Sequence, residues 1–135
     1  MSNANDFAKH SRKTILVVED DTGVGAFLVE ALKTEGGYQA LLVANGTQAF
    51  ERIKTLAPDL FLLDYRLPDI DGLELADRLR AIDEFQQTPI LLMSAATAPK
   101  EREKTQIPFL EKPFELDTFL QAVEESLQRD SPCIS

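Results

Sequence analysis

The chain has 135 residues, of which 44% are hydrophobic, so it has the length of one ordinary domain and can bury its own core. Its 23 acidic and 14 basic residues give a formal net charge of −9, which argues against a surface that binds nucleic-acid phosphates. The only cysteine, Cys133, and the only histidine, His10, lie in polar tails, which excludes an intrachain disulfide, a Cys/His metal site and a histidine-based catalytic triad.

Strand-like and helix-like segments alternate along the chain. Short apolar runs predict five strands, over residues 14–18, 38–43, 59–63, 89–93 and 107–110. Apolar residues at helical spacing predict helices over residues 22–34, 47–56, 72–82 and 115–128. Nearly continuous apolar strands separated by amphipathic helices are typical of a parallel sheet covered on both faces. The pattern therefore predicts a doubly wound α/β fold.

The segment between the fourth and fifth predicted strands departs from this pattern. Residues 95–106 should contain a helix, but the stretch 100–106 is wholly polar and offers no apolar face. Pro99 can occupy the first turn of a helix, where its missing N–H costs little. We therefore expect a short or irregular fourth helix.

The hydropathy pattern predicts a soluble, cytoplasmic protein. No apolar run approaches membrane-spanning length, and residues 1–12 lack the apolar middle of a signal peptide. A single cysteine fits a reducing compartment. We expect a disordered leader over residues 1–12, one domain over 13–129 and a tail over 130–135.

Two of the apolar strands end in acidic residues. Glu19 and Asp20 follow the first predicted strand, and Asp64 follows the third. In a sheet of order 2-1-3-4-5 the carboxyl ends of these strands meet where the strand order reverses, which is where doubly wound sheets bind ligands. Two unit charges about 5 Å apart repel by roughly 3 kcal/mol at an effective dielectric constant near 20, so the cluster needs a cation. Oxygen ligands favour Mg²⁺ or Mn²⁺ over zinc.

A hydroxyl and an ammonium group are predicted at the same edge of the sheet. Ser94 ends the fourth predicted strand, and Lys112 follows the fifth. A cation, a hydroxyl and an ammonium around one carboxylate would stabilise the charge of a transferred phosphoryl group. Asp64 is therefore a candidate nucleophile in phosphoryl transfer.

Three nearby acidic residues have simpler interpretations. Asp21 fits a helix N-cap better than a metal ligand, and Asp69 and Asp71 fit turn and cap residues. The segment LPDIDG is not a calcium-binding loop, because Leu67 would occupy its first ligand position. We leave these residues out of the predicted site.

Four motifs, VVEDD, LLDYRLPDIDG, LLMSA and FLEKPF, follow one another at the ends of the predicted strands. With them, residues 13–129 resemble the response regulator receiver domain of two-component signalling. The resemblance implies a flavodoxin-like fold and a signalling switch in which Asp64 accepts a phosphoryl group from a sensor histidine kinase or a phosphotransfer protein. It implies no enzyme activity beyond self-phosphorylation from a donor and autodephosphorylation.

The resemblance also assigns the metal ligands. It implies that Asp20 binds Mg²⁺ directly, that Glu19 binds it through water, and that Asp64 is a further ligand. The backbone carbonyl of Arg66 would complete the protein ligands.

Further residues are assigned to the phosphoryl group and the switch. The resemblance implies that Ser94 donates a hydrogen bond to the phosphoryl group and that Lys112 pairs with its charge. The Lys112–Pro113 peptide would be cis. Phe109 occupies the position of the family's switch aromatic residue, which would move inward with Ser94.

Several alternatives stay open at this point. A Mg²⁺-dependent phosphohydrolase that forms an aspartyl phosphate would use the same groups, and a phosphorylation-independent binding module would have the same fold. The chain is either a single-domain regulator or a receiver from a longer protein such as a hybrid kinase. We expect a downstream protein partner, no direct contact with nucleic acid or membrane, and a monomer or weak homodimer.

Overall fold

Five parallel strands form the centre of the protein in the computed structural model, which describes residues 12–95 and 106–129. In the order β2-β1-β3-β4-β5, the strands are β2 (Gln39–Val43), β1 (Thr14–Val18), β3 (Leu60–Asp64), β4 (Ile90–Ala95) and β5 (Phe109–Lys112). The helices of the described residues are α2 (Thr22–Thr34), α3 (Gly46–Arg52), α4 (Gly72–Arg80) and α6 (Leu116–Arg129), with a 3-10 helix η1 (Asp83–Phe85). The predicted doubly wound fold and strand order are confirmed.

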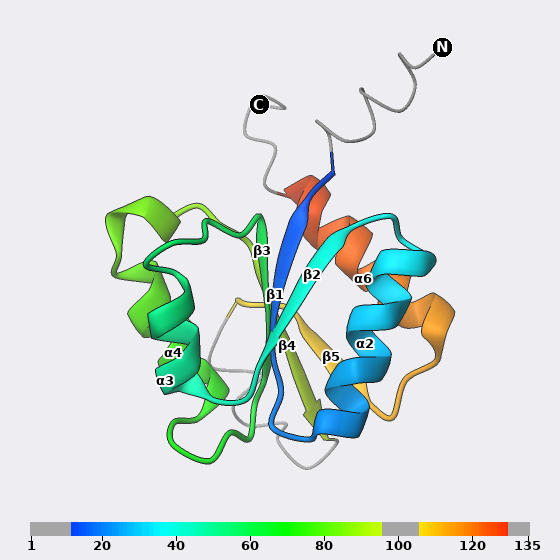
Figure 1. Cartoon of the computed structure of the whole chain (residues 1–135), viewed down its shortest axis with the longest axis horizontal. Coiled ribbons are helices and arrows are strands. Elements are labelled where there is room, and N and C mark those ends of the chain that lie inside the picture. The colour runs from blue at the N-terminus through cyan, green and yellow to red at the C-terminus, as the bar shows by residue number, and fades with distance from the viewer. Residues whose placement is uncertain (1–11, 96–105, 130–135) are drawn as a thin grey trace.

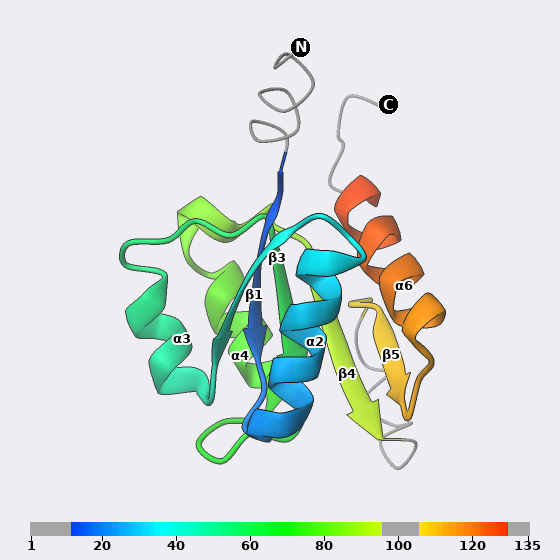
Figure 2. The same cartoon turned by 45° about the vertical axis from the view of Figure 1, so that its right-hand side comes forward.

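The helices form two layers, one on each face of the sheet. Figures 1 and 2 show α3 and α4 on one face and α2 and α6 on the other. Ile15 and Val17 of β1 point into the core beneath α2 and α6, whereas Leu16 and Val18 point into the core beneath α3 and α4. Because successive side chains of a strand alternate between faces, a continuously apolar strand supplies both cores.

Acidic side chains begin two of the helices. Asp21 caps α2, where its Oδ1 accepts a hydrogen bond from the Val24 N–H at 3.0 Å. Asp71 caps α4 in the same way, with the Glu74 N–H at 2.8 Å. Each carboxylate satisfies an N–H group that has no partner within its helix. The predicted capping roles of Asp21 and Asp71 are confirmed.

The second predicted helix is shorter than its apolar pattern indicates. It was expected over residues 47–56, but α3 ends at Arg52 and the chain continues in a turn. There the Thr55 N–H donates to the Arg52 carbonyl, three residues back, at 3.2 Å, as in a tightened helix end. Ile53 and Leu56 still pack against the core beneath α3 and α4. Their burial explains the periodicity without a longer helix.

The helix predicted over 72–82 also ends early, and η1 follows it. Phe85 of η1 is buried, and its ring packs edge-to-face on Phe61 of β3, with centroids 5.3 Å apart and an interplanar angle of 83°. A single 3-10 turn is too short to produce a periodic pattern, so η1 could not be predicted from periodicity.

The last strand begins later than predicted. It was expected over 107–110 but covers Phe109–Lys112, because Pro108 has no N–H and joins the sheet only through its carbonyl, which accepts a hydrogen bond from the Leu92 N–H. The predicted irregular helix falls mainly on residues 96–105, outside the described residues, as do the predicted tail and all but Arg12 of the leader. Among the described helices, none is long and apolar enough to span a membrane.

Candidate functional site

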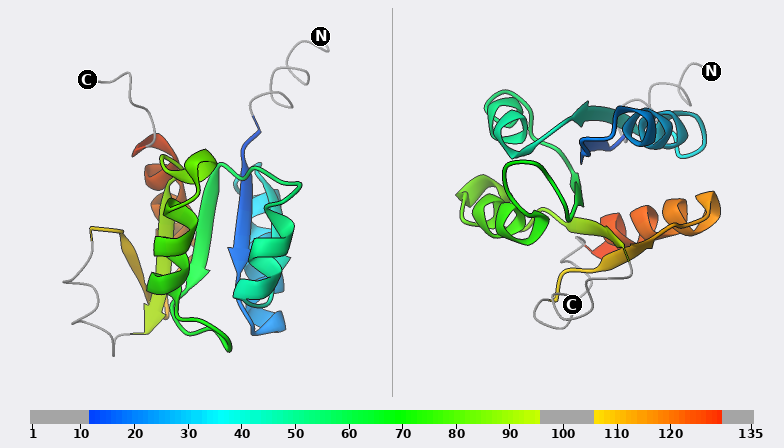
Figure 3. Two further views of the ribbon diagram at one scale, coloured as in Figure 1. Left: turned by 90° about the vertical axis from the view of Figure 1, so that its left-hand side faces the viewer. Right: turned by 90° about the horizontal axis from the view of Figure 1, so that it is seen from below.

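The site lies at the carboxyl ends of β1 and β3. Val18 of β1 pairs with Leu63 of β3, so the residues that follow them, Glu19 and Asp64, lie at the same level of the sheet. Figure 3 shows that the strands of the sheet run in one direction and end at a common edge. Glu19 is held there because its N–H donates to the Val43 carbonyl of β2 at 3.0 Å.

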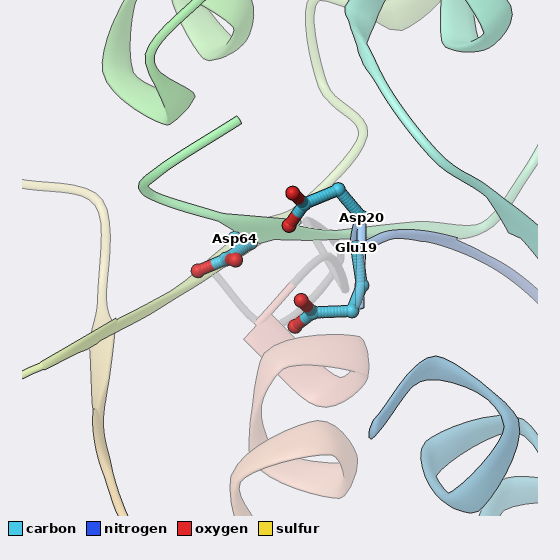
Figure 4. Close-up of side chains that lie close together, drawn as sticks. All are labelled: Glu19, Asp20 and Asp64. Atoms are coloured by element: carbon cyan, nitrogen blue, oxygen red, sulfur yellow. The ribbon is translucent and has the colours of Figure 1, made fainter. Parts of the chain in front are cut away.

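Three carboxylates converge at this edge. Glu19, Asp20 and Asp64 each offer an oxygen, and these oxygens all lie within 4.8 Å of one another. Figure 4 shows the three carboxylates facing a common space from the ends of two strands. Glu19 and Asp64 are buried, with exposed fractions of 2% and 8%, whereas Asp20 is exposed. The cluster is therefore partly desolvated but open to water on the Asp20 side.

Lys112 brings an ammonium group to the cluster from β5. Its Nζ lies 3.0 Å from Glu19 Oε1 and 3.4 Å from Asp64 Oδ1. One positive charge therefore faces three carboxylates, so the group retains an excess of negative charge. This excess is what a divalent cation would compensate.

The balance of burial and charge changes the acidity of Asp64 and Lys112. Burial raises the pKa of Asp64 from 3.8 to about 6; the Lys112 charge opposes this shift and the Glu19 charge adds to it. Burial alone would lower the pKa of Lys112, but its hydrogen bond to Glu19 and the charge of Asp64 outweigh burial and raise it. Lys112 therefore stays charged at neutral pH. Its single positive charge is not enough to bring the pKa of Asp64 back to its ordinary value.

The donor set fits a hard divalent cation. All three groups are carboxylates, and part of the cluster is open to water, which suits the oxygen coordination of Mg²⁺ and its retained water ligands. Cysteine and histidine, the ligands that favour zinc, are absent from the cluster.

The loop from β3 to α4 carries Arg66, two residues after Asp64. Its base is closed by a hydrogen bond from the Gly72 N–H to the Tyr65 carbonyl at 2.7 Å and by an antiparallel bridge between Arg66 and Asp71. A Cβ at Gly72 would lie only 2.7 Å from the Asp64 carbonyl oxygen and 2.8 Å from the Tyr65 Cα. Glycine is therefore required where α4 starts, because the backbone of Asp64 passes directly against it.

The other predicted site residues lie on β4 and β5. Ser94 is buried, and its hydroxyl donates to the Ala95 carbonyl at 3.0 Å. Phe109 is half-buried and packs against the core beneath α3 and α4. The Lys112–Pro113 peptide bond is cis. The structure thus brings Glu19, Asp20, Asp64 and Lys112 into one cluster, whereas the Ser94 hydroxyl is bonded to its own strand.

Asp69 connects the β3–α4 loop to the start of α3, which the sequence did not indicate. It was interpreted as a turn or cap residue of its own loop, but its carboxylate accepts hydrogen bonds from the start of α3: from the Gly46 N–H, the Thr47 N–H and the Thr47 hydroxyl, at 3.0, 2.9 and 2.8 Å. The partners lie 22 and 23 residues earlier in the chain, so no local pattern could have predicted this contact.

Comparison with known proteins places this arrangement in a family. The family model of the response regulator receiver domain matches residues 15–124. Sporulation initiation phosphotransferase F from Bacillus subtilis is 34% identical over 117 residues, which cover 84% of this chain and 92% of that protein. The response regulator receiver protein CpdR from Brucella abortus is 35% identical over 117 residues, which cover 85% of this chain and 97% of that protein. Two other relatives are longer, and the chain spans 57% and 53% of them.

A solved structure supports the same assignment. The receiver domain of the sensor histidine kinase PA1611 from Pseudomonas aeruginosa, described with a magnesium ion in its active site cleft, has a TM-score of 0.75 and 29% identity to this chain. The match covers 87% of this chain and 99% of that structure. The fold, the sequence relatives and the family match agree, and the resemblance seen in the sequence motifs is confirmed. This chain belongs to the response regulator receiver domain family.

Proposed function

We propose that the protein is a phosphorylation-controlled switch in which Asp64 accepts a phosphoryl group from a phosphohistidine of a sensor histidine kinase or a phosphotransfer protein. The observation that carries this proposal is the convergence of the Glu19, Asp20 and Asp64 carboxylates with the ammonium group of Lys112. Asp64 is the member that ends β3 and has Lys112 beside one of its oxygens, 3.4 Å away.

In the proposed reaction, a carboxylate oxygen of Asp64 attacks the phosphorus of the phosphohistidine. An O–P bond forms, the P–N bond breaks, and the imidazole nitrogen keeps the electron pair of the broken bond. Lys112 places a fixed positive charge beside the oxygen atoms on which negative charge accumulates. Such a reaction depends on positioning and charge neutralisation rather than on a protein base.

The carboxylates of Glu19, Asp20 and Asp64 and the carbonyl of Arg66 would hold Mg²⁺ in this site. When bound, Mg²⁺ neutralises carboxylate charge and the charge on the phosphoryl oxygens. Mn²⁺ prefers the same oxygen ligands and would substitute. The related receiver domain of PA1611 has magnesium at its active site cleft, which supports this choice of ion.

We propose that phosphorylation of Asp64 changes the positions of Ser94 and Phe109 and thereby the surface that a partner binds. The Ser94 hydroxyl donates to the Ala95 carbonyl in this structure, and it would turn to an oxygen of the phosphoryl group once one is present. Phe109 is half-buried on the neighbouring strand and would move inward, which biases a two-state equilibrium and alters the binding of a downstream protein. We place this activity in the cytoplasm, with the protein as a monomer or weak homodimer that turns over no other substrate.

The proposal is tested by intact-protein mass spectrometry after incubation with acetyl phosphate. Wild-type protein in Mg²⁺ should gain one phosphoryl group that hydroxylamine removes. The same protein in EDTA and the Asp64→Asn variant in Mg²⁺ should gain none. An adduct of equal yield on Asp64→Asn would overturn the assignment of the acceptor.

A rapid loss of the phosphoryl group would hide the adduct, so beryllofluoride serves as a second probe. It forms a stable analogue of an aspartyl phosphate in the presence of Mg²⁺, and the amide resonances of Asp64 and Ser94 should shift on its addition. If neither an adduct nor a beryllofluoride shift is found, the protein is a phosphorylation-independent binding module. Multiple turnover of phosphate esters would identify it as a phosphohydrolase.

A further inference from the structure

The end of β2 and the start of α3 contain no proposed site residue, but they contact the two segments that carry such residues. These segments are the one that follows β1 and the loop that follows β3. On one side, the Val43 carbonyl accepts a hydrogen bond from the Glu19 N–H at 3.0 Å. On the other side, Gly46 and Thr47 donate to the Asp69 carboxylate. The β2–α3 connection therefore links the segment that follows β1 to the loop that follows β3.

Both oxygens of the Asp69 carboxylate take part in this link. Its Oδ1 accepts the Gly46 N–H, and its Oδ2 accepts both the N–H and the hydroxyl of Thr47. A charged acceptor makes stronger hydrogen bonds than a neutral one. Burial alone would raise the pKa of Asp69, but the hydrogen bonds from Gly46 and Thr47 together outweigh it and lower the pKa, so the carboxylate stays ionised at neutral pH.

The tip of the β3–α4 loop also packs tightly against α3. The methyl carbon Cγ2 of Ile70 lies 2.5 Å from the position that a Cβ at Gly46 would occupy, so only glycine allows the loop to approach so closely. Ile70 also packs against the core beneath α3 and α4. The loop is thus fixed at its base by the Gly72–Tyr65 hydrogen bond and at its tip by Asp69 and Ile70.

Arg66 lies at the base of this loop, where its backbone bridges to Asp71, and only two residues separate it from Asp69. Its carbonyl is the proposed fourth protein ligand of the metal ion. A backbone ligand has no side-chain freedom, so its position depends entirely on the conformation of the loop that carries it. We propose that Asp69 is a positioning residue for the site: by binding the loop to the start of α3, it holds the Arg66 carbonyl in place relative to Asp64 and so sets the affinity for Mg²⁺. This inference rests on the proposed function of Asp64.

The test compares variants that remove long-range carboxylate hydrogen bonds near the site and far from it. Asp69→Ala removes all three bonds, and Thr47→Val removes only the bond from the hydroxyl. Asp59→Ala is the distant control. The Asp59 carboxylate also joins segments far apart in the chain, because it accepts one hydrogen bond from the Thr14 N–H at 2.8 Å, but it lies at the opposite end of the sheet. Urea unfolding of all variants establishes that they are folded and measures their loss of stability.

The main measurement is the dissociation constant of Mg²⁺ alone, obtained by calorimetric titration. Removing a residue that orients metal ligands weakens binding by about tenfold or more, so Asp69→Ala should show a loss of that size. Thr47→Val should show a smaller loss, and Asp59→Ala none. In the metal-free protein, the Gly72 amide should exchange its hydrogen faster in Asp69→Ala than in Asp59→Ala.

Phosphorylation by acetyl phosphate separates this inference from the proposed function. At subsaturating Mg²⁺ the initial rate of Asp69→Ala should fall in parallel with its affinity, and saturating Mg²⁺ should recover most of the wild-type rate. If wild type is phosphorylated and Asp69→Ala binds Mg²⁺ as tightly as Asp59→Ala does, Asp69 is only a structural cap and the inference is wrong. If wild type itself neither binds Mg²⁺ nor reacts, the proposed function fails first.

Discussion

The ammonium nitrogen of Lys112 lies 3.0 Å from Glu19 Oε1, although 93 residues separate the two in the chain. Glu19 is almost completely buried, whereas the Lys112 side chain is 27% exposed and reaches the cluster from β5. The pair therefore joins the segment that follows β1 to the end of β5 before any metal ion is bound.

The Lys112→Met variant should be less stable than wild type without metal, and Mg²⁺ should raise its free energy of unfolding by more than it raises that of wild type. Breaking the ion pair leaves partly buried carboxylates uncompensated, which costs about 1–3 kcal/mol, between the values of exposed and buried pairs. The added negative potential should also tighten Mg²⁺ binding. Urea unfolding with and without Mg²⁺ measures both effects. Lys54→Met is the control, because Lys54 and Glu51 form an exposed pair and its loss should change stability little.

The Asp64→Asn variant should be more stable than wild type when no metal is present. The pKa of Asp64 is raised from 3.8 to about 6 in the folded protein, chiefly by burial. The folded state therefore binds this proton more tightly than the unfolded state does, and ionisation of Asp64 opposes folding. Wild type therefore loses stability as the pH rises through about 4–6, and the variant does not share this loss. At pH 7.5 the difference should be about 1–3 kcal/mol.

Urea unfolding of both proteins in EDTA, at pH 4 and at pH 7.5, measures this difference. The advantage of Asp64→Asn should vanish near pH 4, where Asp64 is protonated in wild type, and Mg²⁺ should reduce it at pH 7.5 by stabilising wild type. An equal advantage at both pH values would show that ionisation of Asp64 is not its cause.

The Phe85→Ala variant tests the unpredicted contact between η1 and β3. Phe85 is buried and packs edge-to-face on Phe61, so its truncation should cost about 3–5 kcal/mol. Thermal unfolding measures the loss. Phe27→Ala removes the same atoms from a side chain that is 56% exposed on α2 and should cost far less. Equal losses would mean that η1 does not contribute to the folding core.

The Ser126→Ala variant should stabilise the protein by about 1 kcal/mol. Ser126 lies in α6 with an exposed fraction of 1%, and among the described residues its hydroxyl has no hydrogen-bond partner. Removing a buried polar atom without a partner recovers its desolvation cost, and alanine also has the higher helix propensity. Urea unfolding measures the gain. A loss of stability would show that the hydroxyl is hydrogen-bonded in solution.

The sequence by itself determined the fold class and the acids of the site. Continuously apolar strands can be buried only inside a sheet covered on both faces, and the residues that follow such strands reach its carboxyl edge because parallel strands end together. This is why Glu19, Asp20 and Asp64 were predicted to meet before the structure showed that they do. N-caps such as Asp21 were predictable because their partners lie three residues away.

Only the tertiary structure decided the features that depend on distant segments. The bonds from Asp69 to the start of α3 and the packing of Phe85 on Phe61 join residues that no local pattern relates. The early end of α3 was hidden from periodicity because Ile53 and Leu56 stay packed on the core beyond it, and the late start of β5 follows from the missing N–H of Pro108. The charge balance at Asp64 required the distances to Lys112 and Glu19, because burial and neighbouring charges act against each other there and only geometry determines which effect is larger.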